Sequence, residues 1–155
     1  MNKITFVCTA NKYRSPVLQY TLQLLLPEVE VSSQGIAQHL PKTRQIASTP
    51  SKCKHLNTWA SYITCDTVRR QLLLHKPEQY SNNSDTMYIF VSDRHKRKYS
   101  TESNCYSISD FIDKKAIDDP LVKSRSVQPM EYIYADIVNV CNNVKKYVDM
   151  RVQKQ

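Results

Sequence analysis

A cysteine and an arginine near the N-terminus stand at a spacing that suits the binding and attack of an oxyanion. Residues 8–16 read Cys-Thr-Ala-Asn-Lys-Tyr-Arg-Ser-Pro, so five residues separate Cys8 from Arg14. Five residues are enough to curl the backbone so that its amides converge in front of the sulfur, and such a nest binds an oxyanion. A guanidinium adds a bidentate contact to a tetrahedral anion, which a lysine ammonium does not make. The stretch predicts a nucleophilic thiol in a phosphate- or arsenate-binding loop.

The residues around this loop predict a strand before it and a helix after it. Residues 4–7 are apolar and β-prone, and Ser15-Pro16 is typical of a helix start. The N-terminus of a helix favours a thiolate over a thiol, because it offers unpaired N–H groups and a partial positive charge. The spacing alone arises by chance with odds of about one in four, and a buried structural cysteine is the competing interpretation. The strand-loop-helix context favours the reactive thiol.

Apolar periodicity along the rest of the chain predicts alternating strands and helices. The expected elements are strands over 1–7, 28–33, 87–91 and 105–108, and helices over 16–26, 42–48, 59–74, 94–99 and from 129 onward. In the helix over 59–74 we expect Tyr62, Val68 and Leu72 to point inward. The last helix carries the clearest apolar stripe, formed by Met130, Ile133, Tyr134, Ile137, Val138, Cys141, Val144 and Val148.

This order of elements predicts an α/β fold. We expect a three-layer sandwich with a small central parallel four-stranded sheet, and a phosphate-binding loop after the first strand. With 155 residues and 41% hydrophobic content, the chain is expected to form a single domain over residues 1–155.

The composition excludes some classes of function. The chain contains one glycine, Gly35, so it has neither a Gly-x-Gly-x-x-Gly nor a Gly-x4-Gly-Lys nucleotide loop. A positive φ inside the Cys8 loop is expected at Asn11 instead. No apolar run reaches about 18 residues and no signal-like segment is seen, so we expect a cytoplasmic protein without membrane contact.

The cysteines and histidines indicate neither a disulfide framework nor a metal site. The cysteines are odd in number and form no Cys-x-x-Cys pair: Cys8, Cys53, Cys65, Cys105 and Cys141. The histidines stand far apart, and each is expected at the surface: His39, His55, His75 and His95. We therefore expect no metal and no cofactor.

The net charge of +8 predicts attraction to anionic partners. Basic residues gather at 94–98 and near the C-terminus, where a solvated face is the simpler interpretation. Nucleic acid is an unlikely partner, because no nucleic-acid-binding motif is present.

Cleavage of a phosphate ester also needs an acid to protonate the departing oxygen. Asp119 is the candidate, because the following Pro120 fixes its backbone in a late loop that is able to fold over the carboxyl end of the sheet. Three other carboxylates compete for this role, namely Asp118, Asp113 and Asp93.

Four features together resemble the low-molecular-weight protein tyrosine phosphatases over nearly the whole chain. They are the loop 8–16 after an apolar strand, Ser33-Gln34-Gly35 after the second strand, Asp93 after the strand 87–91, and Asp119-Pro120 ahead of the last helix. The resemblance implies hydrolysis of phosphotyrosine in a protein substrate, with Cys8 forming a phosphocysteine. It also implies that Ser15 donates a hydrogen bond to the thiolate, that Asn11 maintains the shape of the loop, and that Asp119 acts first as acid and then as base. Phosphate would be bound by Arg14 and by the loop residues Thr9, Ala10, Asn11, Lys12 and Tyr13.

The chain departs from the family pattern at several positions. Ala10 stands where the family usually has glycine, and Tyr13 stands where many members have a second cysteine thought to protect the nucleophile. Leu121 and Val122 follow Asp119-Pro120 in place of aromatic residues that grip the substrate ring. Aryl recognition is therefore expected to involve other residues, Tyr13 among them, or to be loose.

Two alternatives stay open at the level of sequence. A thiol-linked arsenate reductase shares the loop and an Asp-Asp-Pro, but it needs a relay of further cysteines, and Cys53, Cys65 and Cys105 are not spaced like that relay's close pair. A catalytically inactive phosphate-binding or regulatory module is the other alternative. It has no use for a leaving-group acid, so Asp119 argues against it.

Overall fold

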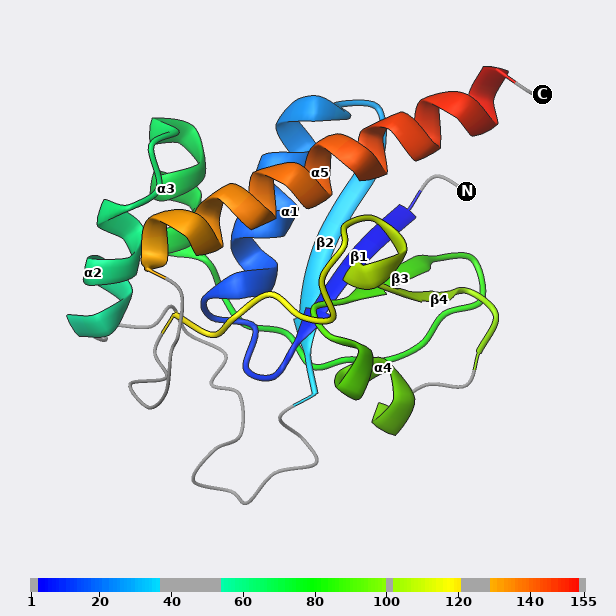
Figure 1. The fold of residues 1–155 in the computed structure, drawn as a ribbon, viewed down its shortest axis with the longest axis horizontal. Coiled ribbons are helices and arrows are strands. Elements are labelled where there is room, and N and C mark those ends of the chain that lie inside the picture. Colours follow the sequence, from blue (N-terminus) through cyan, green and yellow to red (C-terminus); the bar gives the residue numbers. More distant parts are fainter. Residues whose placement is uncertain (1–2, 37–53, 100–101, 121–128, 154–155) are drawn as a thin grey trace.

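The structure, a computed structural model, describes residues 3–36, 54–99, 102–120 and 129–153 (Figure 1). Its strands are β1 (Lys3–Cys8), β2 (Glu30–Gly35), β3 (Met87–Phe90) and β4 (Cys105–Ser107). Its helices are α1 (Arg14–Leu25), α2 (Lys54–Ser61), α3 (Asp66–Leu74), α4 (Asp93–Tyr99) and α5 (Met130–Gln153), and a short 3-10 turn, Ile108–Asp110, follows β4.

The four strands form one parallel sheet in the order β2-β1-β3-β4. The chain leaves β1 in one direction to reach β2, and leaves β3 in the other direction to reach β4. The strand order therefore reverses between β1 and β3, and ligands of open parallel sheets bind at the carboxyl ends of strands beside such a reversal. Cys8 is the last residue of β1, so the loop that follows it opens at this point.

Side chains of β1 alternate between two cores. Phe6 belongs to the larger cluster, which includes Leu18 of α1 and Ile137 of α5. Val7 belongs to a smaller cluster, which Tyr99 of α4 covers. Right-handed crossovers in opposite directions place their helices on opposite faces, and the two clusters agree with that rule. The sheet is thus the middle layer of the expected three-layer α/β sandwich.

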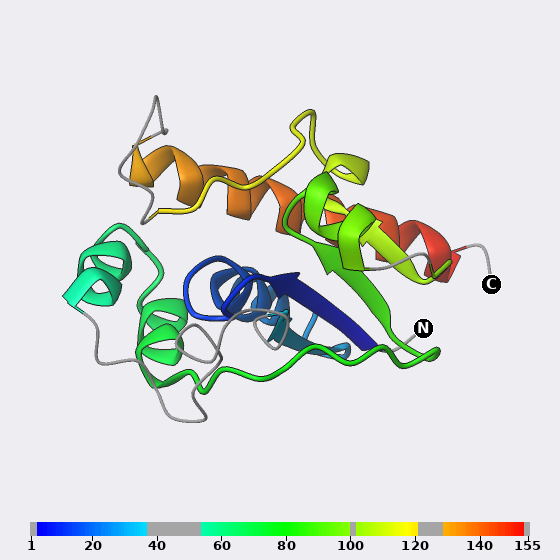
Figure 2. The ribbon, with the colours of Figure 1, turned by 90° about the horizontal axis from the view of Figure 1, so that it is seen from below.

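The long helix α5 lies against α1 over the larger core. Figures 1 and 2 show it crossing the molecule from the side that carries α2 and α3 to the opposite side. The fully buried positions of α5 recur at helical spacing. One position of the predicted apolar stripe differs, because Val140 is buried and Val138 is only partly buried. Within the described ranges, no helix combines the length and the apolar character needed to cross a bilayer.

One predicted helix is divided in two. The sequence predicted a single helix over 59–74, but α2 ends at Ser61 and α3 begins at Asp66. Cys65 has extended φ and ψ of −82° and 113°, and the acidic Asp66 lies in the first turn of α3, where it complements the helix dipole. Val68 and Leu72 are buried as predicted, whereas the side chain of Tyr62 is 39% exposed. The helix predicted over 42–48 lies outside the described residues.

Candidate active site

The thiol of Cys8 lies where β1 gives way to α1, and it is 2% exposed. The backbone N–H of Asn11 donates to its Sγ over 3.2 Å, and the hydroxyl of Ser15 lies 2.9 Å from the same sulfur. Ser15 is in the first turn of α1, which has no acidic residue and, at Tyr13, no side-chain cap. Hydrogen-bond donors and a helix N-terminus both stabilise a thiolate relative to a thiol.

The loop depends on the left-handed conformation of Asn11, whose φ is 56°. Asparagine tolerates this region better than most residues. Its fully buried side chain uses its whole hydrogen-bonding capacity, with Nδ2 donating to Ser15 Oγ (2.9 Å) and Ser33 Oγ (2.8 Å). Because Ser15 accepts from Asn11, its own proton is available to the sulfur of Cys8.

A buried histidine holds the other end of the Asn11 side chain. Asn11 Oδ1 accepts the backbone N–H of Glu78 (2.8 Å) and faces Nε2 of His75 (3.0 Å). Since Oδ1 is an acceptor, Nε2 carries the proton, and Nδ1 accepts from the hydroxyl of Tyr20 over 2.6 Å. Burial lowers the pKa of His75 to about 4, so the ring is neutral. The prediction that His75 lies at the surface is wrong.

A second histidine contacts the start of the loop. His95 in α4 places Nε2 2.8 Å from Thr9 Oγ1 and Nδ1 2.5 Å from Ser92 Oγ. Burial is the largest cause of a pKa lowered to about 4, and the charge of Arg14 adds to it, while the charge of Asp119 acts in the opposite direction. The His95 side chain is only partly exposed and contacts the loop, contrary to the surface position predicted for it. His55 is exposed as predicted.

Two further contacts fix the far end of the loop. The Trp59 ring in α2 donates its N–H to the carbonyl of Tyr13 over 2.8 Å. Arg14 is 8% exposed, and its Nη1 donates to the carbonyl of Ile117 over 3.0 Å. Ala10 and Lys12, which precede these anchors in the loop, are partly exposed. The guanidinium keeps further N–H groups beyond the one that binds Ile117.

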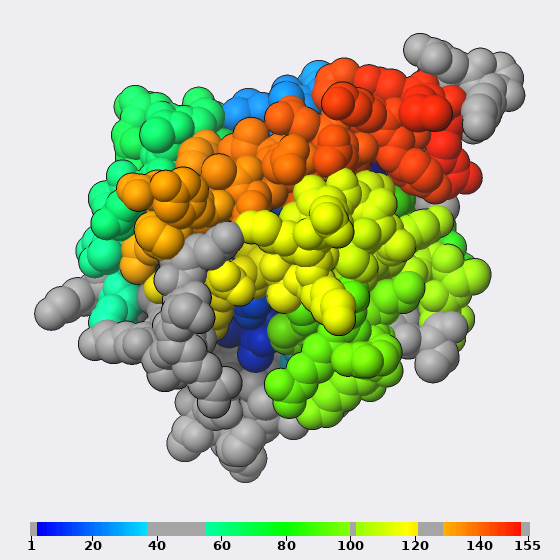
Figure 3. Space-filling model, viewed as in Figure 1, coloured from blue at the N-terminus to red at the C-terminus, as the bar shows by residue number. Residues whose placement is uncertain are grey.

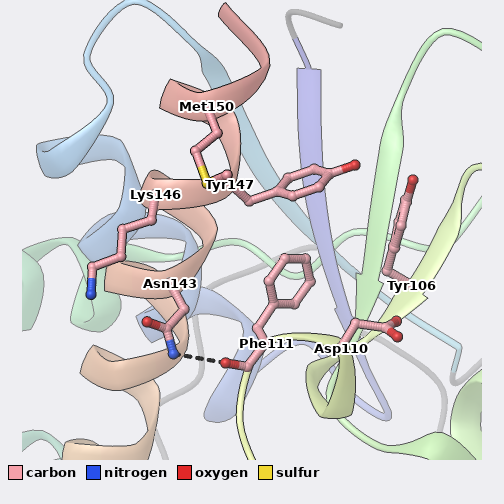
Figure 4. A pocket seen from close by; sticks show the side chains of 7 residues that line it. All are labelled: Tyr106, Asp110, Phe111, Asn143, Lys146, Tyr147 and Met150. Carbon is pink, nitrogen blue, oxygen red and sulfur yellow. Dashed lines mark hydrogen bonds between the residues drawn. The ribbon is translucent and has the colours of Figure 1, made fainter. Parts of the chain in front are cut away.

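The segment that leads to Asp119 is tethered at successive points. Figure 4 shows Asn143 of α5 bound to the carbonyl of Phe111, over 2.7 Å, beside a pocket of about 290 Å³ between α5 and the chain after β4. Lys114 then forms an ion pair with Asp136 of α5 at 2.7 Å. Ile117 donates its N–H to the carbonyl of Val91 at the end of β3, and accepts from Arg14. These contacts bring residue 119 to the same end of the sheet as Cys8.

Asp119 is partly buried, and its charge and that of Arg14 both act on His95. The rival Asp93 accepts from Ser107 and Ser109, 2.5 Å each, and these hydrogen bonds lower its pKa, which disfavours the protonated form that an acid needs. Asp113 is exposed, and Asp118 is partly buried like Asp119. In Figure 3, blue atoms of the N-terminal part lie in a hollow between the yellow segment that leads to Asp119 and the green helix α4.

No family model and no curated protein matches the sequence. Solved structures do match. That of Wzb from Vibrio vulnificus in complex with benzylphosphonate is 25% identical, with a TM-score of 0.71 over 94% of this chain and 98% of that one. The chain has the low-molecular-weight tyrosine phosphatase fold.

Two more structures share this phosphatase fold at lower identity. The tyrosine phosphatase AmsI from Erwinia amylovora is 22% identical, with a TM-score of 0.67 over 92% of this chain and 89% of that one. The arginine phosphatase YwlE from Geobacillus stearothermophilus is 17% identical, with a TM-score of 0.70 over 100% and 97%. The fold predicted from the sequence is confirmed.

The structure also assigns contacts in this phosphatase fold that sequence reasoning missed. Trp59 and His75 bind the loop directly, and Ser92 binds His95, which contacts Thr9; all of them come from segments far from the loop in sequence. Leu121 and Val122 lie outside the described residues. For His95 a signal was present, because it follows closely on the strand predicted at 87–91, and neighbouring parallel strands end at the same edge. For Trp59 and His75 no sequence signal marked the contact. Among the described residues, no group of His, Cys, Asp and Glu is arranged to hold a metal ion.

Replacing Asn11 tests whether its conformation and its side chain both shape the loop. We expect Asn11→Gly to lower kcat/KM because four hydrogen bonds are lost, although glycine tolerates φ of 56°. Asn11→Ala should lose the same bonds and be less stable than the glycine variant by about 1–2 kcal/mol, because its Cβ is strained in this region. Urea unfolding and steady-state kinetics of both variants measure the two effects. Equal stability of the variants would contradict the strain.

The buried His75 and the partly buried His95 predict a loss of stability in mild acid. Their pKa is about 4 in the folded chain and 6.5 is the ordinary value, so between these values the unfolded chain binds more protons. The free energy of unfolding should therefore fall as pH is lowered from 6.5 toward 4. Urea denaturation across this range measures the slope. His75→Gln removes one of the titrating groups and should flatten it, and an unchanged slope would show that His75 does not contribute.

Proposed function

We propose that the chain is a cysteine-dependent phosphatase that hydrolyses aryl phosphate monoesters, with phosphotyrosine in proteins as the substrate class. The observation that supports this most directly is the sulfur of Cys8, which receives the N–H of Asn11 and contacts Ser15 at the start of α1. A thiolate prepared in this way, inside a fold shared with tyrosine phosphatases, is suited to attack phosphorus.

In the proposed first step, the Cys8 thiolate attacks phosphorus, and the bond from phosphorus to the ester oxygen breaks. Asp119 gives its proton to that oxygen, which leaves as a phenol. The amides of residues 9–13 and the guanidinium of Arg14 bind the oxygens of the phosphoryl group while charge is redistributed. The products of the step are a phosphocysteine and an ionised Asp119.

In the proposed second step, water attacks the phosphocysteine while Asp119 accepts a proton from it. The bond from sulfur to phosphorus breaks, and the electrons return to Cys8 as a thiolate. Inorganic phosphate leaves, and Ser15, which is free to donate its proton, stabilises the sulfur as a leaving group. Both halves of the reaction use the same carboxyl group, first as acid and then as base.

The position of Cys105 favours this function over arsenate reduction. A reductase passes a disulfide from the nucleophile to further thiols. Cys105 is buried in the smaller core, whereas Cys8 belongs to the larger one on the other face of the sheet. A relay through Cys105 would therefore have to cross the sheet. The tethered Asp119 segment likewise favours an enzyme over an inactive phosphate-binding module.

Hydrolysis of p-nitrophenyl phosphate and of a phosphotyrosine peptide tests the proposal. We expect turnover of both at about pH 5 to 6 in the presence of a chelator, with competitive inhibition by vanadate. A phosphoarginine peptide and arsenate with a thiol donor serve as alternative substrates. Turnover of either one without turnover of the aryl esters would overturn the proposed function.

A further inference from the structure

Helix α4 concentrates positive charge beside the candidate site. Four of its seven residues are basic, namely Arg94, Lys96, Arg97 and Lys98, and none of its residues is buried. Among the described residues, none of these four forms an ion pair with a carboxylate. Like charges so close together repel one another, and this repulsion offsets the favourable interaction of the last-turn cations with the helix dipole.

Other contacts hold this helix in place. Asp93, at its start, binds the hydroxyls of Ser107 and Ser109, and Tyr99, at its end, packs on the smaller core. His95 joins it to Thr9 in the loop, and the backbone N–H of Asp93 donates to the carbonyl of Lys115 in the segment that leads to Asp119. The basic helix is thus fastened directly to both parts of the site.

A hollow of about 370 Å³ adjoins the helix. Its lining includes the basic Lys96 and Arg97 together with Ser107, Ser109, Asp93 and Asp110. The two carboxylates already accept hydrogen bonds, Asp93 from both serine hydroxyls and Asp110 from the backbone N–H of Ser107. Among the described residues, no hydrogen bond or ion pair joins Lys96 or Arg97 to either carboxylate, although the charge of Arg97 helps to lower the pKa of Asp93.

We propose that α4 is a docking surface for acidic residues that flank the phosphorylated residue of a protein substrate, an inference that rests on the proposed function. Arg97 and Lys98 lie two and three residues beyond His95, or about 3 to 5 Å along the helix axis. An extended peptide advances about 3.3 Å per residue. A distance of 3 to 5 Å corresponds to about one or two residues of extended peptide, so carboxylates close in sequence to the phosphorylated residue are within reach of these cations.

The place of the charge favours a substrate segment over nucleic acid. The cations adjoin the loop that would hold the substrate's phosphate, so one peptide can contact both, whereas a nucleic acid would need a surface independent of the site. Exposed charge pairs contribute modestly, but several act together and also speed association.

Three phosphotyrosine peptides test the proposal. They carry acidic residues on the N-terminal side, acidic residues on the C-terminal side, or glutamine at all these positions. We expect kcat/KM at low salt to be about five- to tenfold higher for at least one acidic peptide, and the preference to shrink at about 0.5 M salt. Arg97→Gln with Lys98→Gln should remove most of the preference. The matched control, Lys146→Gln with Arg151→Gln, removes the same charge from exposed positions of α5 and should retain it.

Hydrolysis of p-nitrophenyl phosphate distinguishes a failure of the proposed phosphatase function from a failure of the proposed docking surface. It lacks flanking residues, so wild type and both double variants should hydrolyse it with kcat/KM values within about twofold. If none of them does, the proposed function fails. If all three proteins hydrolyse it, two results would still contradict the docking surface. One is equal hydrolysis of the three peptides, and the other is an equal loss of the acidic preference in the α4 and α5 variants. Duplex DNA is tested as a competitor of peptide hydrolysis. If DNA inhibits the wild type but not the α4 variant, and no peptide preference is seen, α4 binds nucleic acid and the peptide-docking proposal is wrong.

Discussion

Replacing Cys8 with serine is expected to abolish turnover of aryl phosphates while leaving the proposed phosphate-binding loop in place. A serine hydroxyl does not ionise at neutral pH, and Asn11 and Ser15 stabilise negative charge on sulfur, so a fall in kcat on the order of 10⁴-fold or more is expected. The loop amides and Arg14 are unchanged in this variant. Stopped assays with p-nitrophenyl phosphate measure the loss, and calorimetry with a phosphotyrosine peptide measures the binding that remains.

The control for this variant is Cys65→Ser, which changes a partly exposed thiol between α2 and α3. We expect it to keep near wild-type activity. If calorimetry shows that Cys8→Ser binds the phosphotyrosine peptide, the variant is also suited to trapping phosphoproteins from a cell extract. Residual hydrolysis in Cys8→Ser that matches the wild type would exclude Cys8 as the nucleophile.

Asp119→Asn is expected to slow the hydrolysis of phenyl phosphate far more than that of p-nitrophenyl phosphate. The phenolate of the first ester is a poor leaving group and needs the proton, whereas p-nitrophenolate departs more readily without it. We expect a loss of roughly 10²- to 10³-fold for the poor leaving group and a clearly smaller one for the good one. A series of substituted phenyl phosphates measures the dependence of kcat/KM on the pKa of the leaving phenol.

Asp118→Asn is the matched control, because it removes a neighbouring carboxylate from the same segment. It should change kcat/KM little and leave the dependence on the leaving group intact. A uniform loss across the series in Asp119→Asn, or the expected pattern in Asp118→Asn instead, would assign the acid to another residue.

The part of the site that could be predicted is the part that is continuous in sequence. The end of β1, the loop after it and the first turn of α1 contain four of the site residues, Cys8, Asn11, Arg14 and Ser15. Their spacing in the sequence therefore determines much of their relative geometry. Asp119 was predicted with rivals, and the structure shows why Asp93 is a poor one, since two serine hydroxyls bind its carboxylate. The parallel sheet was likewise predictable, because its strands are short apolar runs between turn residues.

The contacts that support the loop could not be predicted, because they are made between distant segments. Trp59 reaches the carbonyl of Tyr13 across 46 residues, and His75 reaches Asn11 across 64. Neither residue has a local pattern that distinguishes it from a core tryptophan or a surface histidine. The break between α2 and α3 was missed for a related reason, since the apolar spacing on both sides of Ile63 fits a helix and the break lies in the backbone of Cys65.

The bond from the backbone N–H of Glu78 to Asn11 Oδ1 makes the loop visible to amide hydrogen exchange. Glu78 lies outside every helix and strand, and its side chain is exposed, yet its amide is held by a fully buried acceptor. Its exchange rate therefore reports how often the Asn11 network opens. The order of the Cys8 loop can thus be followed at a single residue without any substrate.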